Sequence, residues 1–454
     1  MPKKKTALTI EERLQQALVP AEEQPYEVPE NWVWVRLENV ASWGSGGTPS
    51  RKHEEYYNGD ILWIKTGELN NGWIYDTEEK ITDEGLKKSS AKLFPPYSVL
   101  IAMYGATIGK VAILGVPATT NQACACAVCN QSLLYMYLFY YCISQKNVFI
   151  EKGKGGAQPN ISQIILKQHP IPLPPLSEQQ RIVERIEELF AKLDEAKERL
   201  QEAADSFAVR KAAILHKAFT GELTQQWRRE NGVSDESWEE KTIGEICSSL
   251  KYGTSKKSSD DGEVVVLRMG NLQNGEIDWS NLAYTSDEED IKKYLLKSGD
   301  VLFNRTNSPE LVGKTSIYRG EMPAIYAGYL IKLDYEKNIV VGDYLNYYLN
   351  SSKAKEYYMQ VKTDGVSQSN INAKKIGEFE IPLPTLSEQH EIVRLIDDLL
   401  ARERKAQQAT EQALASIDLM KKSILARAFR GELGTNKASE ASALELLRQV
   451  LAEN

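Results

Sequence analysis

Three closely spaced cysteines and four histidines are the residues whose types first suggest chemistry in this sequence. Cys124, Cys126 and Cys129 resemble the start of a zinc site, but no fourth ligand follows at finger or ribbon spacing. The run Cys124-Ala-Cys-Ala-Val128 reads instead as a strand of small apolar residues. The histidines, at positions 53, 169, 216 and 390, have no plausible serine or cysteine nucleophile beside them. The sequence therefore predicts neither a metal site nor a catalytic triad.

Two glycine-lysine pairs suggest phosphate binding. Gly105-Ala-Thr-Ile-Gly-Lys110 is one residue short of a P-loop and continues with Val111 where a hydroxyl should stand. Gly313-Lys-Thr315 has Ser308 in place of the first glycine of that motif. A hairpin that enters a strand explains both segments better. Their lysines are then either contacts for nucleic-acid phosphates or simply solvated side chains.

One further motif suggests group transfer to a base. Phe94-Pro-Pro-Tyr97 resembles the Asn/Asp-Pro-Pro-Tyr/Phe loop of adenine-N6 methyltransferases, whose first side chain hydrogen-bonds the target amino group. Phenylalanine has no polar atom for that bond, and no glycine-rich nucleotide loop follows a strand elsewhere. We therefore expect a plain turn before the following strand.

An internal repeat determines where these residues must lie. Ile171-Pro-Leu-Pro-Pro-Leu-Ser-Glu-Gln-Gln180 recurs as Ile381-Pro-Leu-Pro-Thr-Leu-Ser-Glu-Gln-His390, and Ile214-Leu-His-Lys-Ala-Phe-Thr-Gly-Glu-Leu223 recurs as Ile424-Leu-Ala-Arg-Ala-Phe-Arg-Gly-Glu-Leu433. Both pairs have the same offset. Upstream of these landmarks the likeness is weaker, as expected of domains that share a framework but differ in their loops. The order is variable domain, near-identical helix, variable domain, near-identical helix.

The two near-identical segments are predicted to be long amphipathic helices. Ser177 to Leu223 has no proline and no glycine before Gly221, and its apolar residues recur at steps of three and four. Ser177 and Gln180 are expected to form a capping box at its start. Each helix would be roughly 60–70 Å long at 1.5 Å per residue. Two such helices can bury their apolar stripes against each other as an antiparallel coiled coil with a pseudo-twofold axis; the alternative is that each packs on its own domain.

Each variable domain is predicted to have an α+β fold. Short apolar runs such as Ser98-Val-Leu-Ile-Ala102 and Asp300-Val-Leu-Phe303 alternate with glycine, asparagine and aspartate turns. Each copy ends in a tyrosine-rich helical stretch whose rings are expected to form core. The expected boundaries are 1–31 for an N-terminal helical segment, 32–168 for the first variable domain, 169–235 for the first spacer helix, 236–378 for the second variable domain, 379–434 for the second spacer helix and 435–454 for a C-terminal helical tail.

The duplicated Ile-Pro-Leu-Pro-x-Leu-Ser-Glu-Gln and Ala-Phe-x-Gly-Glu-Leu motifs, alternating with two divergent domains, resemble the specificity subunit of type I restriction-modification systems. The resemblance covers nearly the whole chain. It implies that each variable domain is a target recognition domain for one half of a bipartite DNA site. It also implies that the helices form a spacer and dock two modification (methyltransferase) subunits.

The same resemblance implies that this chain has no catalytic centre and no cofactor. S-adenosylmethionine, ATP and Mg²⁺ would then belong to the modification subunits and to the restriction subunits, which act as endonuclease and translocase. Two other functions stay open: a self-contained adenine-N6 DNA methyltransferase, which cofactor binding by the pure chain would reveal, and a DNA-binding scaffold without a modification partner.

DNA reading requires donors and acceptors for base edges and cations for phosphates. Before the Gly-Lys turn the first copy has Ala102-Met-Tyr-Gly-Ala106, whereas the second has Asn304-Arg-Thr-Asn-Ser308, whose arginine and asparagine suit guanine and adenine. The polar loops 152–158 and 362–368 lead into the shared Gln-x-Asn-Ile, whose asparagines are about as well explained as turn residues. The predicted DNA-binding residues are Lys65, Tyr104, Lys110, Lys154, Gln158, Asn160, Arg268, Arg305, Asn307, Lys314, Gln368 and Asn370.

The overall charge limits how the chain would bind DNA. It has 55 lysines and arginines against 63 aspartates and glutamates, a net charge of -8 over 454 residues. We therefore expect weak, salt-sensitive DNA binding by the isolated chain, with partner subunits supplying much of the phosphate contact. Five cysteines without regular spacing are typical of a reducing compartment, and no stretch is long and apolar enough to span a membrane. A cytoplasmic protein is expected.

Overall fold

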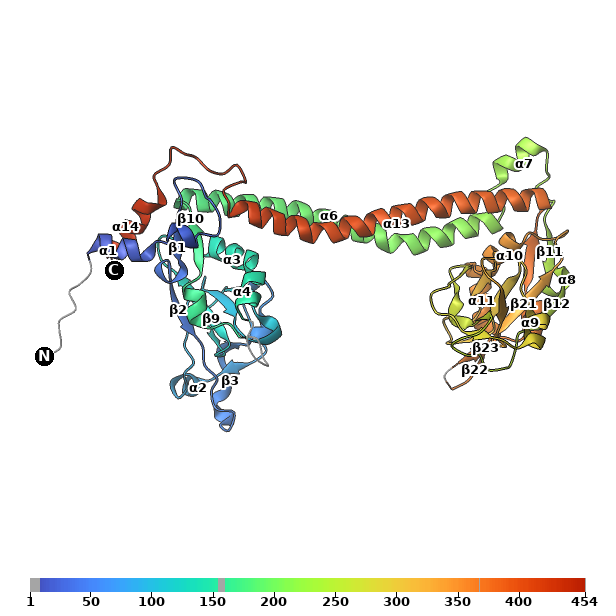
Figure 1. Cartoon of the computed structure of the whole chain (residues 1–454), viewed down its shortest axis with the longest axis horizontal. Coiled ribbons are helices and arrows are strands. Elements are labelled where there is room, and N and C mark those ends of the chain that lie inside the picture. The colour runs from blue at the N-terminus through green and yellow to red at the C-terminus, as the bar shows by residue number, and fades with distance from the viewer. Residues whose placement is uncertain (1–8, 154–159, 367, 454) are drawn as a thin grey trace. The chain divides into compact units, whose positions relative to one another are not determined.

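The computed structural model describes residues 9–153, 160–366 and 368–453. The chain divides into two compact units (Figure 1). Unit 1 consists of residues 1–199 and 413–454, and unit 2 consists of residues 200–412. Both boundaries fall inside the two long helices, so each unit contains one α+β domain together with part of each helix.

Unit 1 is built on a five-stranded sheet with the order β2-β9-β6-β7-β4. Central strand β6 pairs antiparallel with both of its neighbours, and short β4 adds in parallel at one edge. Val99 and Ile101 of β6 face a core that includes the tyrosine-rich helix α3, whereas Leu100 and Ala102 face a second core with Phe94. This alternation is the two-residue period of a strand buried on both faces. The strands are β2 Ala41–Ser45, β4 Trp73–Ile74, β6 Val99–Ala102, β7 Val111–Leu114 and β9 Cys124–Cys129, and α3 is Tyr135–Ser144.

Unit 2 repeats this framework. Its four-stranded sheet has the order β12-β21-β17-β19, which matches β2-β9-β6-β7 strand for strand, and all of its pairs are antiparallel. Helix α10 takes the place of α3 and contributes Tyr344 and Tyr348 to the core. The predicted duplication of an α+β domain is confirmed. The elements are β12 Cys247–Tyr252, β17 Val301–Asn304, β19 Thr315–Ile317, β21 Leu330–Tyr335 and α10 Gly342–Leu349.

Smaller elements complete both units. In unit 1 they are α1 Ile10–Ala17, β1 Val33–Arg36, β3 Tyr57–Ile64, β5 Lys80–Ile81, α2 Asp83–Lys87, β8 Thr119–Thr120, α4 Lys146–Lys152, α5 Gln163–Lys167, β10 Pro170–Leu173 and α14 Ala443–Glu453. In unit 2 they are α7 Gln225–Asn231, β11 Glu239–Thr242, α8 Ile243–Ile246, β13 Val264–Leu267, β14 Leu272–Gln273, β15 Glu276–Ile277, β16 Tyr284–Thr285, α9 Glu288–Tyr294, β18 Thr306–Asn307, β20 Ala324–Tyr326, α11 Ser352–Val361, β22 Thr363–Asp364, β23 Ser369–Asn370, α12 Ala373–Gly377 and β24 Glu380–Leu383.

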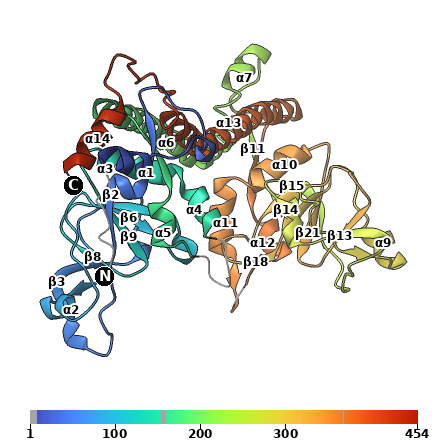
Figure 2. The ribbon, with the colours of Figure 1, turned by 60° about the vertical axis from the view of Figure 1, so that its left-hand side comes forward.

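Two short antiparallel ribbons join the start of each domain to its end. β1 pairs with β10 in unit 1, and β11 pairs with β24 in unit 2. The first proline of each Ile-Pro-Leu-Pro segment, Pro172 or Pro382, therefore lies in a two-stranded ribbon, where the missing N–H is tolerated. In unit 1 the first and last helices, α1 and α14, lie beside each other and share the core (Figure 2).

The predicted long helices are α6, Leu176–Phe219, and α13, Leu386–Ala428, with 44 and 43 residues. In unit 1 the first part of α6 contacts the last part of α13, where Lys421 Nζ lies 2.5 Å from Asp194 Oδ1. In unit 2 the last part of α6 contacts the first part of α13, where Arg210 Nε lies 2.8 Å from Glu403 Oε2. As the residue number rises along α6, the number of its partner on α13 falls, so the two helices pair antiparallel, as predicted.

The predicted capping box is wrong in detail. Helix α6 begins at Leu176, one residue before Ser177, and the Gln180 amide donates to Glu184 Oε1 at 3.0 Å rather than back to the cap. Glu178 and Gln179, the two residues that follow Ser177 in the motif, are both fully buried. Gln179 Nε2 donates to the Ser132 and Pro174 carbonyls, and its Oε1 accepts from Leu134 N at 2.9 Å. The glutamine of this motif therefore docks the helix on its own α+β domain.

Candidate nucleic-acid interface

A small three-stranded sheet in unit 2 gathers several of the predicted residues. Its order is β18-β23-β22, with Thr306 opposite Asn370 and Asn307 opposite Ser369. Arg305 immediately precedes β18, and exposed Gln368 immediately precedes β23. Arg305 and Asn370, which are 65 positions apart in the chain, thus lie side by side. Several donors and acceptors must lie together in this way to contact the edge of a base pair.

Arg305 is held in a defined orientation. Its Nη2 donates to Asn370 Oδ1 at 3.1 Å, and its Nη1 makes a long contact of 3.5 Å with the Gly328 carbonyl. Its guanidinium carbon lies 4.8 Å from the centroid of the Tyr252 ring. Asn370 is fixed in turn because its Nδ2 donates to Thr306 Oγ1 at 2.8 Å.

The remaining donors of Arg305 are of two kinds. Its Nε is buried and has no partner among the described residues. A guanidinium carries five N–H donors, so each terminal nitrogen keeps one hydrogen beyond the contacts with Asn370 and Gly328. Two such hydrogens are the number that a bidentate contact with guanine uses.

Unit 1 has a β-bridge at the place where β18 pairs with β23 in unit 2, but most of its side chains differ. Tyr104 pairs with Asn160 as Thr306 pairs with Asn370, and Ile161 N donates to the Met103 carbonyl as Ile371 N does to Arg305. The residue that answers to Arg305 is therefore Met103, which is buried and uncharged. Tyr104 and Asn160 are both exposed. Predicted Lys154 and Gln158 lie outside the described residues.

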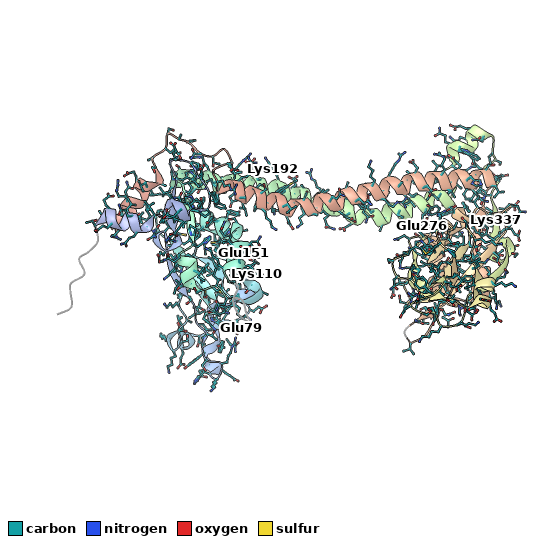
Figure 3. The ribbon with its side chains drawn as sticks, in the orientation of Figure 1. Glu79, Lys110, Glu151, Lys192, Glu276 and Lys337 are labelled. Carbon is teal, nitrogen blue, oxygen red and sulfur yellow. The ribbon has the colours of Figure 1, made fainter. Side chains whose placement is uncertain are left out.

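The two predicted phosphate lysines follow equivalent turns. Gly109 and Gly313 have φ values of +74° and +94°, which glycine adopts readily, and each precedes its lysine. Lys314 Nζ donates to Gln273 Oε1 at 2.9 Å. Lys110, labelled in Figure 3, is half-buried directly before β7. Each segment connects two antiparallel strands, β6 with β7 and β17 with β19, as expected of a hairpin rather than a P-loop.

Lys65 and Arg268 occupy equivalent places but differ electrostatically. Each backbone N–H donates to the side chain three residues later, Glu68 in unit 1 and Asn271 in unit 2. Lys65 Nζ lies 2.9 Å from Glu79 and 3.4 Å from Glu78, and the bond to Glu79 raises the pKa of the lysine. Arg268 Nη2 donates instead to the Asn281 side chain at 3.0 Å. No carboxylate among the described residues forms an ion pair with Arg268, whereas two carboxylates compensate the charge of Lys65.

The structure adds aromatic partners of arginines that the sequence did not single out. Tyr252 lies under Arg305 and is 41% exposed, and its hydroxyl accepts from Ala373 N at 3.0 Å. In unit 1 the Arg51 guanidinium carbon lies 4.3 Å from the centroid of the Tyr57 ring. Neither tyrosine stands in a motif, so only spatial proximity reveals the two pairs.

The cysteines and the phenylalanine considered for other chemistry pack within unit 1. Cys124 and Cys126 lie in the core, and burial raises the pKa of Cys126 and of Cys129 to about 12. Across residues 9–153, 160–366 and 368–453 no group of three or more histidine, cysteine, aspartate or glutamate side chains is arranged to hold a metal ion. Phe94 is buried and pairs with Ala118 in a bridge. Within those same ranges, no helix has the length and hydropathy needed to cross a membrane.

Comparison with known proteins bears on the whole chain. A family model described as the type I restriction modification DNA specificity domain matches residues 29–204 and 235–413. The EcoKI specificity subunit of Escherichia coli strain K12 is 27% identical over 450 residues, covering 94% of this chain and 96% of the relative. The StySPI specificity subunit of Salmonella potsdam is 26% identical over 449 residues with the same coverage.

Solved structures share the fold. The HsdS subunit from Thermoanaerobacter tengcongensis matches 90% of this chain and 100% of its own length, with a TM-score of 0.63 and 22% identity. A chain from a study of complex assembly and conformational transition of the type I R-M system matches 90% of this chain and 100% of its own, with a TM-score of 0.67 and 21% identity.

Proposed function

The chain belongs to the specificity subunits of type I restriction-modification systems, since the family model matches most of both units, and from that premise we propose that each α+β domain reads one half of a bipartite DNA site. The supporting observation is the pair of equivalent bridges with unlike side chains. Unit 2 presents Arg305 beside Asn370, whereas unit 1 presents Tyr104 beside Asn160. A shared scaffold with different donors suits two different half-sites.

In unit 2 we assign base reading to four side chains around β18 and β23. Arg305 suits guanine, and Asn307 suits adenine, since an amide can donate and accept at one base edge. Gln368 and Asn370 supply further amides. Lys314 and Arg268 would contact phosphates, which position the domain without reading sequence.

In unit 1 the side chains proposed to read bases are uncharged. Tyr104 would stack or contact a thymine methyl, Asn160 would read a base edge, and Lys110 would contact phosphate. Lys154 and Gln158 stay assigned from the sequence. Lys65 is the least favoured phosphate contact because two carboxylates already compensate its charge.

The long helices would form the spacer and dock two modification subunits. Two helices that share their end motifs offer two related surfaces, as binding two copies of one partner requires. The chain itself would contribute no catalytic group and hold no cofactor, and S-adenosylmethionine, ATP and Mg²⁺ would act in the modification and restriction subunits. A cytoplasmic location follows from that role.

The test is a change of one half-site by one substitution. Methylated adenines are mapped in a host that contains the modification subunits and either the original chain or Arg305→Ala. The half-site read by unit 2 should relax at one base pair, with a loss of roughly 1–3 kcal/mol of discrimination. The other half-site should stay unchanged.

Two further variants sharpen this result. Arg305→Lys keeps the charge but lacks the fork, so it should relax the same base pair while retaining affinity. Arg210→Ala, which removes an ion pair between α6 and α13, should leave the recognised site intact. Equal loss of methylation at all sequences with Arg305→Ala would contradict base reading by this residue.

A further inference from the structure

Unit 1 carries an exposed cluster of aromatic rings that DNA reading does not explain. It consists of Trp73 and Tyr75 at β4, Tyr97 in a turn and Tyr135 at the start of α3. The ring centroid of Trp73 lies 6.1 Å from those of Tyr75 and Tyr97 and 5.9 Å from that of Tyr135. Trp73, Tyr75 and Tyr97 are 36%, 64% and 56% exposed. We call these four residues the aromatic cluster.

The backbone at Tyr97 indicates that the turn itself does not require this ring. Tyr97 has a φ of +67°, and the other non-glycine residues with positive φ, Asn58, Asn71 and Asn274, are all asparagines among the residues that the structure describes. The left-handed conformation is unfavourable for a bulky side chain. The counterpart in unit 2 is Gly299, with a φ of +91° and the same backbone bond to the neighbouring strand. A glycine would satisfy this turn, so the ring persists at a conformational cost.

Unit 2 has charges where unit 1 has the aromatic cluster. Glu276, labelled in Figure 3, follows the Asn-Gly turn of its hairpin. Trp73 follows the equivalent Asn-Gly pair in unit 1. Arg319 lies 2.8 Å from Glu276 and 2.8 Å from Asp343, at the start of α10. The guanidinium and the two carboxylates thus form a partly exposed ion-pair network. The two units therefore present unlike surfaces at equivalent places.

The charges beside the aromatic cluster argue against DNA as its occupant. Exposed Glu187 of α6 lies close enough to Tyr135 to raise the pKa of that tyrosine, after burial and Tyr97. Asp76, next to Tyr75, is paired with Lys80 at 3.0 Å. The charge of Asp76 is thus compensated, whereas exposed Glu187 would repel a phosphate backbone. A protein face with an apolar centre and basic edge would complement the cluster, because exposed tryptophan and tyrosine are favoured anchors of protein interfaces.

Helix α3, which carries Tyr135 of the aromatic cluster, is attached to the spacer helix by buried contacts. Tyr135 starts α3, the Leu134 N–H that precedes it bonds to Gln179 of α6, and Tyr140 packs against Phe190 of α6 at 5.9 Å. We propose that the aromatic cluster is part of the docking surface for one modification subunit, so that this subunit binds unit 1 more tightly than its identical copy binds unit 2. The inference rests on the proposed function, which assigns the helices to those subunits.

The experiment uses the full chain and the modification subunit of its own system, with binding followed by native mass spectrometry and by calorimetric titration. The original chain should bind two subunits with unequal affinities. Tyr97→Gly copies the turn of unit 2 and should leave the chain folded, while weakening the tighter site about tenfold, the scale of one interface anchor. Trp73→Glu combined with Tyr97→Gly should bring the two affinities together.

A matched control is Tyr329→Ala, which removes a 50% exposed tyrosine of unit 2. It should leave the tighter site unchanged. Two bound subunits with unaltered affinities in the Trp73→Glu, Tyr97→Gly chain would overturn the docking surface while leaving the proposed function in place. No binding by the original chain would overturn both. Loss of DNA binding alone, or of self-association alone, would assign the aromatic cluster to another occupant and refute the inference.

Discussion

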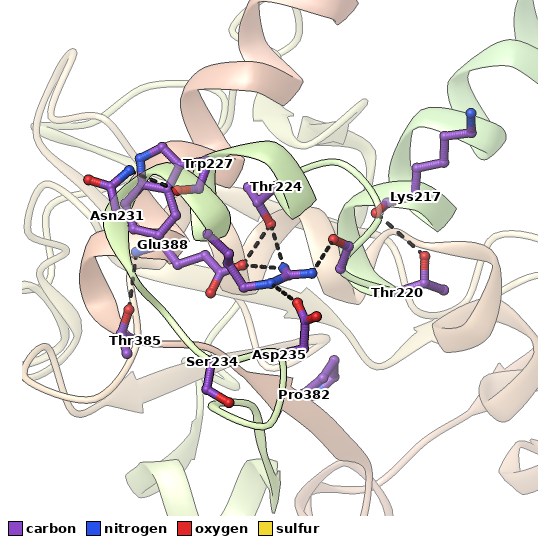
Figure 4. Close-up of polar contacts among 12 residues, drawn as sticks. Lys217, Thr220, Thr224, Trp227, Asn231, Ser234, Asp235, Pro382, Thr385 and Glu388 are labelled. Atoms are coloured by element: carbon purple, nitrogen blue, oxygen red, sulfur yellow. Dashed lines mark hydrogen bonds and ion pairs between the residues drawn. The ribbon is translucent and has the colours of Figure 1, made fainter.

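Two buried carboxylates show how one motif position is stabilised in two ways. Glu178 and Glu388 occupy the same place in the repeated motif, and both are fully buried. Glu178 accepts from Trp32 Nε1 and from Asn436 Nδ2, each at 2.8 Å. Glu388 accepts from Arg228 Nη1 at 2.6 Å (Figure 4). Glu388 also accepts from Thr224 Oγ1 at 2.6 Å. Among the described residues only Glu388, and not Glu178, has a guanidinium in hydrogen-bond contact, and Arg228 is the cation that compensates it.

Arg228→Ala is therefore expected to destabilise unit 2. Removing one partner of a buried ion pair leaves an uncompensated charge, which costs about 3–5 kcal/mol. Urea unfolding of the full chain measures the loss. Adding Glu388→Gln should restore a large part of it, because the lone buried charge is then removed.

Arg210→Ala is the matched control for this prediction. Its ion pair with Glu403 lies on the helix surface, with side chains 41% and 26% exposed. An exposed pair contributes about 0–1 kcal/mol. If the two arginine variants lose equal stability, the special role of Arg228 is wrong.

His169 predicts how stability depends on pH. Burial, together with nearby Lys152, lowers the pKa of His169 to about 3. The unfolded chain takes up a proton near pH 6.5 and the folded chain does not, so stability falls as the pH drops below that value. The loss should be roughly 1.4 kcal/mol between pH 7.5 and 5.5.

Unfolding free energies at pH 7.5, 6.5 and 5.5 test this effect. His169→Gln should flatten the dependence, although its stability at pH 7.5 can differ. His53→Gln changes an exposed histidine and should keep the original slope. Identical slopes for the original chain and His169→Gln would contradict the assignment.

At the scale of elements, each long helix serves both units. Phe219, the last residue of α6, packs on Tyr344 and Tyr348 of unit 2, with ring centroids 5.3 and 5.0 Å apart. Phe429, just after α13, packs on Tyr137 and Tyr141 of unit 1 at 5.2 and 5.1 Å. The Ala-Phe-x-Gly-Glu-Leu motif of each repeat thus packs on the α+β domain of the other repeat. Each long helix therefore packs with its start on the domain that precedes it in the chain and with its end on the domain of the other repeat.

At the scale of the whole molecule, a duplicated framework carries unlike surfaces. Strand order, the Gln179 and Gln389 bonds and the tyrosine–phenylalanine packing recur in both units. The surface side chains do not recur. Arg305 of unit 2 takes the place of Met103 in unit 1, and the charged group around Arg319 takes the place of the aromatic cluster. Symmetry in the framework suits a repeated partner, and asymmetry at the surfaces suits two different DNA half-sites.

The spacer role predicts that helix length sets the gap of the recognised site. Inserting the same four helix-forming residues after Arg199 and after Gln412 lengthens both paired helices by about 6 Å. The mapped site should keep both half-sites and gain base pairs between them. An unchanged gap in the methylated sites would contradict the spacer role, and the single insertion after Arg199, which shifts the register of the pair, should impair assembly.

The site was only partly predictable from sequence. The divergent loop pointed to Arg305, because the repeat shows which positions differ on a common framework, and the shared Gln-x-Asn-Ile segment pointed to Asn370. The structure joins the two side chains at 3.1 Å. Tyr252 and the aromatic cluster carried no such signal. Their members come from separate strands and turns, and nothing local in a sequence records which of these meet.

By itself the sequence determined the duplication, the two long helices and the α+β character of each domain, because periodicity and repeat spacing are local properties of the chain. Only the tertiary structure decided which helix end packs on which domain, that Glu178 and Glu388 are buried, and that Tyr97 is held at positive φ. These features depend on contacts between residues distant in the chain, such as Trp32 with Glu178. Their energies arise from burial and hydrogen bonding that exist only after the chain has folded.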